Sequence, residues 1–591
     1  MKFAYATSDF ATIRREKSFY VDKTPYFPQL EQIGNYLVFL RPRRFGKSTL
    51  LSTLGKYYDI ALSGQFDELF GGLWIHENPT AEKNKYLVLH LDFSPVASEG
   101  TEVEIRRSFA WQLRVSIRSF IRRYQSVVPE LAALEPIVRS DSDDVAAIMF
   151  DLLATLRDAG RQMYLFIDEY DHFGNRLISD GLLDTYQSIV RSAGFVRSFY
   201  ASLKAFTTAG TVARMFVTGV SPIMLDDLSS GFNIIKHVSQ HAELNGLIGF
   251  TTADVERGVD LVLRDRPEVI KDPRMGNRAE LLQTLKRYYN GYRFSINASE
   301  NLYNSTLVLY FLGEVLRCGI YPRQMLDLNV RTDYGRLYAV TKATSGEERG
   351  TRELLEEILT NESIATHMVE QFGTKVKFGH AQIVSLFYYM GMLTYAEDAA
   401  AHDPPKLVIP NRVMRELQWD YLALALADHD GLRIDASYIE VALSKMSEYG
   451  DIQPLLDVFK DRVLSRISNR DLIQFNEKTM KLMLFSFLAP SGVFYLMSEK
   501  EVAQGYCDLL LGLKGHASAQ KYAWIIEAKY VKTDATDKDI DAVVQQGLAQ
   551  IERYASDQDL VQMLTRGLFL RAGVLVFVGL KDVRYWGWEK V

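Results

Sequence analysis

Cysteine is almost absent from this chain of 591 residues, which contains only Cys318 and Cys507. Two cysteines are too few for a disulfide framework, and they lack the spacing of a metal site, so the sequence favours a reducing compartment. Long apolar runs are absent too. The amino terminus has no apolar stretch of signal-peptide length, and no later segment stays apolar long enough to span a bilayer. We therefore expect a cytoplasmic protein that does not enter the membrane.

A strong charge of one sign is also lacking, because 68 lysines and arginines against 74 aspartates and glutamates leave a net charge of −6. Nucleic-acid binding must then come from a local groove and not from a global polycation. What the chain does have is apolar material, with 47 % hydrophobic and 12 % aromatic residues. A chain of this length and composition can build roughly three or four domains.

The segment Asn35–Thr49, NYLVFLRPRRFGKST, passes from an apolar strand-like run through an arginine-rich turn into a helical pattern. The small Gly46 lets backbone N–H groups close on a phosphate, and a helix beginning near Lys47 points its positive end at the same anion. Lys47 is expected to reach the terminal phosphates of a nucleotide and the Ser48 hydroxyl to bind Mg²⁺. Arg41 stands where the usual G-x-x-x-x-G-K-[ST] pattern has its first glycine.

Two later strand-like runs add polar groups of the kind that a nucleotide site needs. Tyr164–Glu169 ends in Asp168, which is expected to hold the magnesium ion, and in Glu169, which is expected to polarise the attacking water. Met215–Val220 contains Thr218, which we expect to sense the terminal phosphate from a neighbouring strand. Three such runs in this order, separated by helix-length intervals, predict nucleotide binding with Mg²⁺. We expect the nucleotide to be ATP, although the runs do not distinguish ATP from GTP.

Residues that flank the glycine and lysine of this loop complete the predicted nucleotide contacts. Arg44 and Thr49 belong to the same turn and helix start and are included in the nucleotide-binding set. Either Arg43 or Arg44 is expected to contact a phosphate or a neighbouring subunit, so a homo-oligomer stays open as an alternative to a single chain.

The order of elements predicts an α/β protein with several domains. Residues 1–245 alternate helical stretches with strand-like runs, as in a P-loop NTPase parallel sheet covered by helices. The runs are Tyr36–Leu40, Tyr86–Phe93, Met163–Ile167 and Met215–Val220. Residues 246–395 indicate a helical lid or adaptor, and residues 396–470 a winged-helix-like end with a helical linker. The acidic tip between the two short strands of the winged-helix-like module favours packing over DNA binding. Residues 471–591 indicate an α/β core of the restriction-endonuclease type.

The carboxyl-terminal domain contains a second chemical pattern. Tyr506–Leu513 and Lys521–Tyr530 are strand-like runs joined by a polar turn, which indicates a hairpin. If the turn is symmetric about its centre near Ala517 and Ser518, two acidic residues face each other across the strands. These are Asp508 and Glu527. Facing carboxylates are unfavourable unless a cation such as Mg²⁺ or Mn²⁺ compensates them, so the register predicts a metal site.

Period-two alternation puts Lys529 on the same face as Glu527. Asp508 and Glu527 are then metal ligands, the Ala528 carbonyl is a candidate third ligand, and Lys529 orients or deprotonates a water that attacks a phosphodiester. An alternative is an edge hairpin with solvated carboxylates, in which Lys529 is an ordinary surface partner. The nuclease interpretation rests on further residues in the expected order around the hairpin.

Several residues around the hairpin are candidates to support this centre. A glutamate on the preceding helix, Glu477, or one near the end of the next strand, Glu499 or Glu501, is expected to complete the metal sphere. The helix after the hairpin carries a polar stripe at i, i+4 and i+8 that is able to face the active site or the substrate backbone. Its members are Gln546, Gln550 and Tyr554.

With these motifs in place, nearly the whole chain resembles the microbial family of AAA-ATPase-like proteins fused to a PD-(D/E)XK nuclease domain. The blocks that carry the resemblance are FYVDKTPYF (Phe19–Phe27), RPRRFGKSTL (Arg41–Leu50), LFIDEYD (Leu165–Asp171), FVTGVSP (Phe216–Pro222), NGYRF (Asn290–Phe294) and YNSTLVLYFL (Tyr303–Leu312). The family's phosphate loop also tends to have the arginine-rich form, which accommodates Arg41. The YNST stretch departs from the usual YNP-S form without touching a catalytic residue.

The resemblance implies roles residue by residue. It assigns nucleotide and magnesium contacts to Lys47 and Ser48, the acidic strand end to Asp168 and Glu169, and the nuclease signature to Asp508, Glu527 and Lys529. We expect an ATP-binding switch NTPase that controls a metal-dependent nuclease, with DNA preferred over RNA. The alternative is a nucleotide-dependent switch or assembly protein whose carboxyl-terminal domain binds nucleic acid or a partner without cleaving it. A DNA-translocating motor fits less well, because no second motor core is evident.

Overall fold

The computed structural model folds into two compact units. The first unit contains Met1–Tyr321, Leu326–Leu354 and Glu362–Met414, and the second contains Pro322–Met325, Leu355–Asn361 and Arg415–Val591. The predicted segment 396–470 is thus divided between the units, and the predicted domain bounds stay predictions. The structure describes the chain except residues 1, 6, 141, 192–193, 229–231, 270–276, 323, 328–334, 336–338, 341–347, 371, 373–377, 431–435, 467–476, 489–492, 503–504, 514–518, 566–568 and 590–591.

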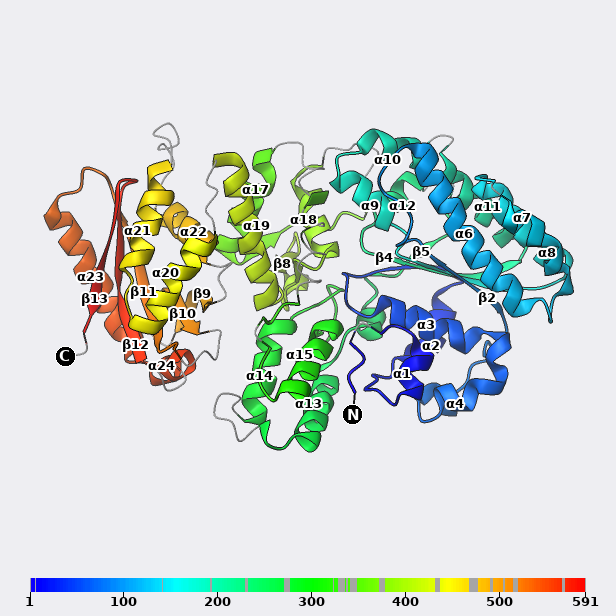
Figure 1. The fold of residues 1–591 in the computed structure, drawn as a ribbon, viewed down its shortest axis with the longest axis horizontal. Helices are drawn as coiled ribbons and strands as arrows, with labels where there is room; N and C mark the ends of the chain where they lie inside the picture. Colours follow the sequence, from blue (N-terminus) through cyan, green and yellow to red (C-terminus); the bar gives the residue numbers. More distant parts are fainter. Residues whose placement is uncertain are drawn as a thin grey trace. The chain divides into compact units, whose positions relative to one another are not determined.

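The first unit is built on a five-stranded parallel sheet with the order β2-β3-β4-β1-β5 (Figure 1). Its strands are β1 (Tyr36–Leu40), β2 (Leu87–Asp92), β3 (Met163–Asp168), β4 (Val212–Gly219) and β5 (Lys236–His237). Four of them match the strand-like runs of the sequence, and β5, a two-residue edge strand, was not predicted. Because β1 and β3 both neighbour β4, the ends of all three strands meet at one edge of the sheet.

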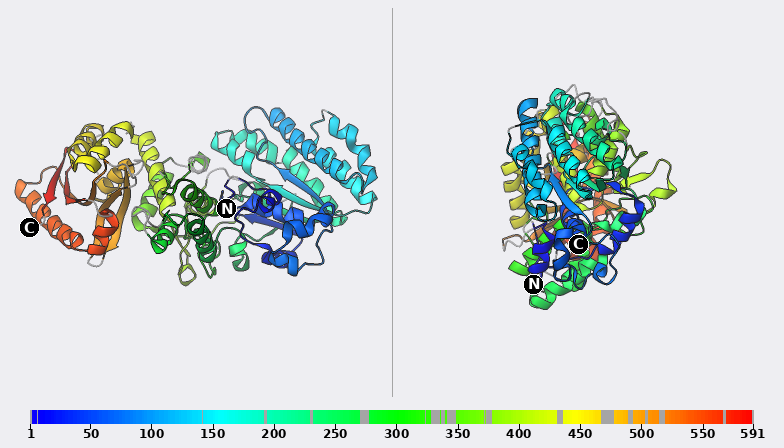
Figure 2. Two further views of the ribbon diagram at one scale, coloured as in Figure 1. Left: turned by 60° about the horizontal axis from the view of Figure 1, so that its bottom comes forward. Right: turned by 90° about the vertical axis from the view of Figure 1, so that its right-hand side faces the viewer.

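Helices cover both faces of this sheet (Figures 1 and 2). The crossovers β1→β2 and β2→β3 run in opposite directions along the sheet, so right-handed connections place their helices on opposite faces. The helices up to β5 are α1 (Phe10–Arg15), α2 (Phe27–Ile33), α3 (Lys47–Tyr58), α4 (Phe66–Phe70), α5 (Trp74–Glu77), α6 (Glu102–Tyr124), α7 (Glu135–Arg139), α8 (Val145–Asp158), α9 (His172–Ser179), α10 (Leu183–Val190), α11 (Phe195–Thr208) and α12 (Ile223–Leu228).

The remainder of the first unit is mainly helical, as the sequence predicted for the lid. It contains α13 (Thr252–Asp265), α14 (Arg278–Tyr289), α15 (Ser305–Cys318), α18 (His380–Tyr389) and a small antiparallel sheet of β6 (Ser363–Ala365), β8 (Lys406–Val408) and β7 (Thr394–Tyr395). Helix α13 starts at a capping box in which the Thr251 and Asp254 side chains each bond the other residue's backbone N–H. Helices α17 (Glu348–Asn361) and α19 (Arg412–Asp430) each begin in the first unit and end in the second.

The second unit contains a five-stranded mixed sheet with the order β13-β12-β11-β10-β9. Its elements are α20 (Ala436–Tyr449), α21 (Gln453–Arg462), α22 (Glu477–Leu488), β9 (Phe494–Val502), β10 (Gly505–Leu513), β11 (Tyr522–Val531), α23 (Asp537–Ala555), α24 (Gln558–Thr565), β12 (Phe569–Val578) and β13 (Asp582–Trp588). Strands β10 and β11 form the predicted antiparallel hairpin, whereas β11 and β12 are parallel and joined through α23 and α24. Both predicted sheets, the parallel one and the mixed α/β core, are therefore present.

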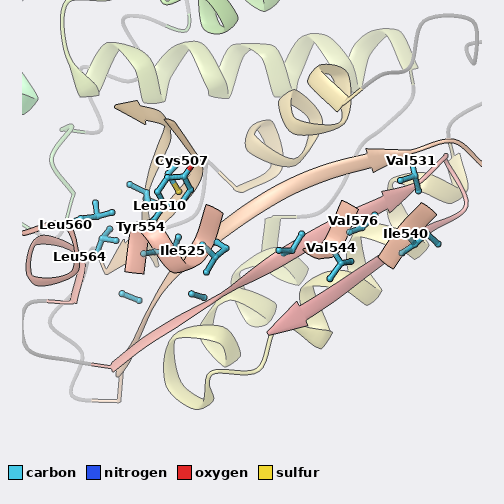
Figure 3. Close-up of a cluster of buried hydrophobic side chains, with 14 of the residues drawn as sticks. Cys507, Leu510, Ile525, Val531, Ile540, Val544, Tyr554, Leu560, Leu564 and Val576 are labelled. Carbon is cyan, nitrogen blue, oxygen red and sulfur yellow. The ribbon is translucent and has the colours of Figure 1, made fainter. Parts of the chain in front are cut away.

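Apolar residues pack on both faces of this second sheet. Leu510 and Ile525 belong to a buried cluster with residues of α23 and α24, such as Val544 and Leu560 (Figure 3). The adjacent strand positions turn to the other face, where Leu509 and Ile526 line a small apolar space with residues of α21 and α22. The alternation of apolar residues along β10 and β11 thus fixes the pairing register, because a slip of one residue would exchange the two faces.

Candidate functional sites

The phosphate loop joins the end of β1 to the start of α3. Gly46 has φ +98°, a left-handed conformation that explains why a glycine precedes the lysine. The Lys47 side chain is 4 % exposed, and its ammonium group donates to the backbone carbonyls of Arg41 (3.0 Å) and Pro42 (3.2 Å). The loop therefore folds around its own lysine, and the first N–H groups of a helix of 12 residues point to the same place.

The acidic end of β3 lies directly beside this loop. The Ser48 hydroxyl donates to Asp168 Oδ2 at 2.6 Å, and the Thr218 hydroxyl on β4 donates to Asp168 Oδ1 at 2.6 Å. Burial, together with the neighbouring Glu169, raises the pKa of Asp168 in spite of these two hydrogen bonds. A carboxylate held by a serine hydroxyl in a mostly buried position is a suitable arrangement for a magnesium ion beside a phosphate.

Glu169 follows Asp168 in a left-handed conformation, with φ +50°. One carboxylate oxygen lies 3.8 Å from the ammonium of Lys47, and the other lies 3.9 Å from Nδ1 of His172. His172 in turn lies 3.0 Å from the guanidinium of Arg43. The sequence did not single out His172, because its position three residues after Glu169 gives no sign that it shares this network.

The same groups line a cavity of about 430 Å³ in the first unit. Lys47, Ser48 and Glu169 lie at one part of its wall, together with Arg43, Arg44 and Thr49. The FYVDK block of the amino-terminal segment and the stretch around Phe250 supply apolar and polar wall residues. The predicted residues of the loop therefore all line one cavity. Asp168 is connected to this cavity by its hydrogen bond from Ser48, and Thr218 in turn donates to Asp168.

Arg41, the residue in place of the usual first glycine, has a structural position. Its side chain is 2 % exposed, and its guanidinium lies 4.3 Å from the ring centroids of both Phe39 and Phe294. It donates to the carbonyls of Leu40 and Ser239. Burial lowers the pKa of Arg41 to about 9. The arginine therefore ties the end of β1 to the block Asn290–Phe294.

The phosphate loop also packs against the helical part of the first unit. Phe45 contacts the rings of Tyr292 and Phe294 edge to face, with centroids 4.7 Å and 5.2 Å away. The carbonyl of Phe294 accepts a hydrogen bond of 2.9 Å from the Tyr388 hydroxyl on α18. At Gly391, a Cβ atom would lie 2.7 Å from Cγ of Pro42. This aromatic turn therefore packs on the loop and connects it to α18 and to the turn before β7.

In the second unit, the hairpin register agrees with the prediction. Leu509 pairs with Ile526 and Leu510 with Ile525, and the same register continued by one residue beyond the paired positions sets Asp508 opposite Glu527. The turn itself, with its predicted centre near Ala517 and Ser518, lies outside the described residues. Both side chains are largely buried, with exposed fractions of 10 % for Asp508 and 2 % for Glu527.

Each of these carboxylates is compensated by a lysine. The ammonium of Lys529 lies 2.9 Å from Glu527 Oε1, as the shared strand face predicted. The ammonium of Lys481 on α22, which the sequence did not single out, lies 2.8 Å from Asp508 Oδ1 and 2.7 Å from Glu477 Oε1. Burial by itself lowers the pKa of Lys481, but Asp508 and Glu477 outweigh it, and the net effect is a raised pKa.

The remaining candidates occupy different positions around this centre. Glu499 and Glu501 lie on β9, where Glu501 pairs with Tyr506 and Glu499 falls opposite Asp508, but their side chains are outside the described part of the structure. On α23, Gln550 has a buried Oε1 without a hydrogen-bond partner among the described residues. Tyr554 belongs to the apolar cluster, and burial, with Glu527 nearby, raises its pKa to about 12.

The donor set around Glu527 fits a hard divalent cation. Glu527 Oε2 is buried and has no hydrogen-bond partner within the described ranges. Burial and the neighbouring Asp508 raise the pKa of Glu527 to about 7, because an uncompensated negative charge is unfavourable there. Among the residues that the structure describes, no group of three or more histidine, cysteine, aspartate or glutamate side chains is placed to hold a metal. Two carboxylates and the backbone near Ala528 are therefore the ligands that the described part offers.

Comparison with known families assigns a domain to each centre. Residues 4–229 match the family described as predicted AAA-ATPase, and residues 475–584 match the PD-(D/E)XK nuclease superfamily. The chain joins an AAA-ATPase-like domain to a PD-(D/E)XK nuclease superfamily domain. The AAA-ATPase-like match covers the phosphate loop, Asp168 and Thr218, and the nuclease match covers the hairpin with both of its carboxylates. The individual roles of these residues stay predictions.

Two further similarities accompany these domains. An uncharacterised protein from the vnfD 5′ region of Azotobacter chroococcum mcd 1 is 26 % identical over 318 residues, which are 52 % of this chain and 51 % of that protein. The match thus spans about half the length of the relative. The solved structure of Cdc6p from Pyrobaculum aerophilum aligns with this chain at 12 % identity and a TM-score of 0.22. The alignment covers 71 % of this chain and 100 % of the Cdc6p chain.

No helix within the described residues is both long and apolar enough to cross a membrane. The two site residues that the sequence did not reveal, His172 and Lys481, both lie on helices and reach a site whose main groups are on strand ends.

Proposed function

We propose that this chain is a nucleotide-controlled nuclease, in which an ATP-binding and hydrolysing domain switches a metal-dependent domain that cleaves phosphodiester bonds in DNA. The observation that carries the proposal is the buried group of Asp508, Glu527 and Lys529 at one point of the hairpin. A structural protein gains nothing from facing carboxylates in such a position, because their burial is costly. A nuclease of this superfamily needs them.

In the AAA-ATPase-like domain, the residues of the loop bind and orient the nucleotide. Lys47 exchanges the carbonyls of Arg41 and Pro42 for phosphate oxygens, which compensate its charge better than neutral carbonyls. Ser48 and Asp168 would hold a Mg²⁺ ion, which would neutralise charge on the phosphates. Glu169 lies close to Lys47 and orients the attacking water. Thr218 holds Asp168 from the neighbouring strand.

In the nuclease domain, Asp508 and Glu527 would hold the metal, and the Ala528 carbonyl is the candidate third ligand. A divalent cation bound there would supply a Lewis acid for the phosphodiester. Lys529 orients the attacking water by donating a hydrogen bond from its ammonium, which already lies at the carboxylate of Glu527. Gln550, with its buried amide oxygen, and Glu477 support the centre.

The packing around the phosphate loop supports control by the nucleotide. Pro42 lies against Gly391, and Phe45 packs on Tyr292. A change in the conformation of the loop must therefore shift the residues between α18 and β7. Helix α19, which follows β8, begins in the first unit and ends in the second. A nucleotide that prefers one conformation of the loop can in this way shift the population of states available to the nuclease domain.

The test is cleavage of plasmid and single-stranded DNA with Mg²⁺ or Mn²⁺, with and without ATP, by the full chain. We compare the wild type with Asp508→Ala and with Lys47→Ala. The cleavage rate of Asp508→Ala should fall by a factor of about 100 or more if the carboxylate holds the metal. Cleavage should respond to ATP in the wild type and not in Lys47→Ala.

Two outcomes would contradict the proposal in different ways. Cleavage that is the same in Lys47→Ala, whatever the nucleotide, would remove the control and leave a nuclease. No cleavage under any condition, with nucleotide binding retained, would favour the switch or assembly protein that binds nucleic acid or a partner without cutting. A parallel assay with RNA distinguishes the substrate class.

A further inference from the structure

Lys481 occupies a position that the predicted nuclease chemistry does not use. It lies on α22, one helical turn after Glu477, and its side chain is 14 % exposed. A glutamate followed four residues later by a lysine is an ordinary helix-surface pair. Here the ammonium also reaches across to strand β10, where it lies 2.8 Å from Asp508 Oδ1. The lysine therefore links the helix to a carboxylate that we propose as a metal ligand.

Both oxygens of Asp508 are engaged by donors of the protein. Oδ1 faces the ammonium of Lys481, and Oδ2 accepts the backbone N–H of Ala528 at 3.0 Å. Glu527 differs, because Lys529 engages only its Oε1. Glu527 Oε2 is buried and has no hydrogen-bond partner in the part of the chain that the structure describes. Of the facing pair, Asp508 is thus satisfied without a metal and Glu527 is not.

The charges of the described side chains at this centre also balance closely without a metal. Among these side chains, three carboxylates, from Glu477, Asp508 and Glu527, face two ammonium groups, from Lys481 and Lys529, which leaves one negative charge when all five groups are ionised. A divalent cation added to this set would give one positive charge in a mostly buried place. It would also share an oxygen with the ammonium of Lys481, and two cations at one carboxylate oxygen repel each other strongly where water is scarce.

We propose that Lys481 is an exchangeable counter-ion, which holds Asp508 and Glu477 in the metal-free protein and leaves Asp508 when a divalent cation binds. The inference rests on the proposed function, since it takes Asp508 and Glu527 as the metal-binding pair. Lys481 then sets the metal affinity of the nuclease domain, because each binding event must displace its ammonium. Glu477, held by the same lysine, becomes available to the metal only after that displacement.

The first measurement is Mn²⁺ binding to the full chain, followed by electron paramagnetic resonance without nucleotide or nucleic acid. We compare the wild type with Lys481→Met, which keeps an unbranched apolar stem and removes the charge. The variant should bind Mn²⁺ about tenfold more tightly, since the competing cation is gone. The Asp508→Asn variant identifies the signal of this centre. The part of the Mn²⁺ signal that is missing in this variant comes from the nuclease centre, and the part that remains comes from Mn²⁺ bound elsewhere in the chain.

The second measurement is thermal unfolding in EDTA and in saturating Mn²⁺. In EDTA, Lys481→Met should unfold at a lower temperature than the wild type, because Asp508 loses its counter-ion and remains buried. Saturating Mn²⁺ should remove this difference. Lys481→Gln keeps a hydrogen-bond donor without the charge, and it gives the same comparison of Mn²⁺ affinity if Lys481→Met does not fold.

The matched control is Lys460→Met, which breaks an ion pair of similar length, 2.9 Å to Asp582, elsewhere in the same unit. It should leave the Mn²⁺ affinity unchanged. If Lys481→Met and Lys481→Gln bind Mn²⁺ with the same affinity as the wild type or more weakly, this inference is wrong, while the nuclease proposal still stands. If no part of the wild-type Mn²⁺ signal depends on Asp508, both this inference and the nuclease proposal are wrong.

Discussion

At the scale of single residues, the unusual phosphate loop has a specific explanation in Arg41. Its guanidinium lies close to the rings of Phe39 and Phe294 and donates to two buried backbone carbonyls. A glycine at position 41 would give the loop more conformational freedom, but it would also remove every one of these contacts. The arginine is therefore part of the framework that holds the loop.

We predict that Arg41→Gly, which restores the usual glycine of the loop pattern, destabilises the first unit. The loss should be about 3 kcal/mol, because a buried stack and hydrogen bonds to buried carbonyls disappear together. Chemical denaturation of the full chain measures it, with Arg139→Ala, an exposed arginine, as the control that should change stability by less than about 0.5 kcal/mol. Unchanged stability with tighter ATP binding in Arg41→Gly would contradict the structural role.

At the scale of elements, the contact between the phosphate loop and the turn after α18 matters most. Gly391 has φ +77°, and a Cβ there would lie 2.7 Å from Pro42 Cγ. The carbonyl of Pro42 is one of the two that hold the ammonium of Lys47. A side chain at position 391 must therefore displace the loop at the point where the lysine is held, or move the turn away from it.

Gly391→Ala should weaken ATP binding about tenfold in an equilibrium titration, since the loop must shift to admit the new methyl group. The matched control is Gly210→Ala. Gly210 has a similar φ of +75°, but a Cβ added there would have no other atom within 4 Å, so the control carries the same backbone strain of about 1 kcal/mol without the contact. Equal ATP affinities for the two variants would show that the contact with Pro42 has no part in binding.

At the scale of the whole molecule, the two units have separate sheets and separate apolar cores. Units with their own cores commonly unfold in separate transitions. Each also contains its own proposed ligand site, with Lys47 in the first unit and Asp508 in the second. Ligand binding therefore offers a way to assign the transitions.

We predict two transitions in calorimetry of the full chain. ATP at about 100 times its Kd should stabilise the transition of the first unit by about 2.7 kcal/mol, and Mn²⁺ alone should stabilise that of the second. Lys47→Ala should abolish only the ATP shift and Asp508→Asn only the Mn²⁺ shift of the second transition. A single transition that both ligands move equally would contradict this assignment.

Local patterns in the sequence determined much of this architecture. The positions of β1 to β4, the start of α3 at Lys47 and the hairpin register, which pairs Leu509 with Ile526, all agree with the structure. These features depend on neighbours along the chain: apolar runs, a glycine before a lysine, and the period of two in a hairpin. The chemical roles of the residues remain predictions that the experiments above test.

Tertiary structure alone decided the partners that come from distant segments. Arg41 meets Phe294, and Lys481 meets Asp508, across 253 and 27 positions of sequence. Lys481 looked like half of an ordinary helix pair with Glu477, since nothing local shows that β10 passes beside it. The sequence thus determined which polar groups lie at the strand ends and turns, because these positions depend on neighbours along the chain. The fold decided which cations compensate them, because charge and packing act through space and not along the chain.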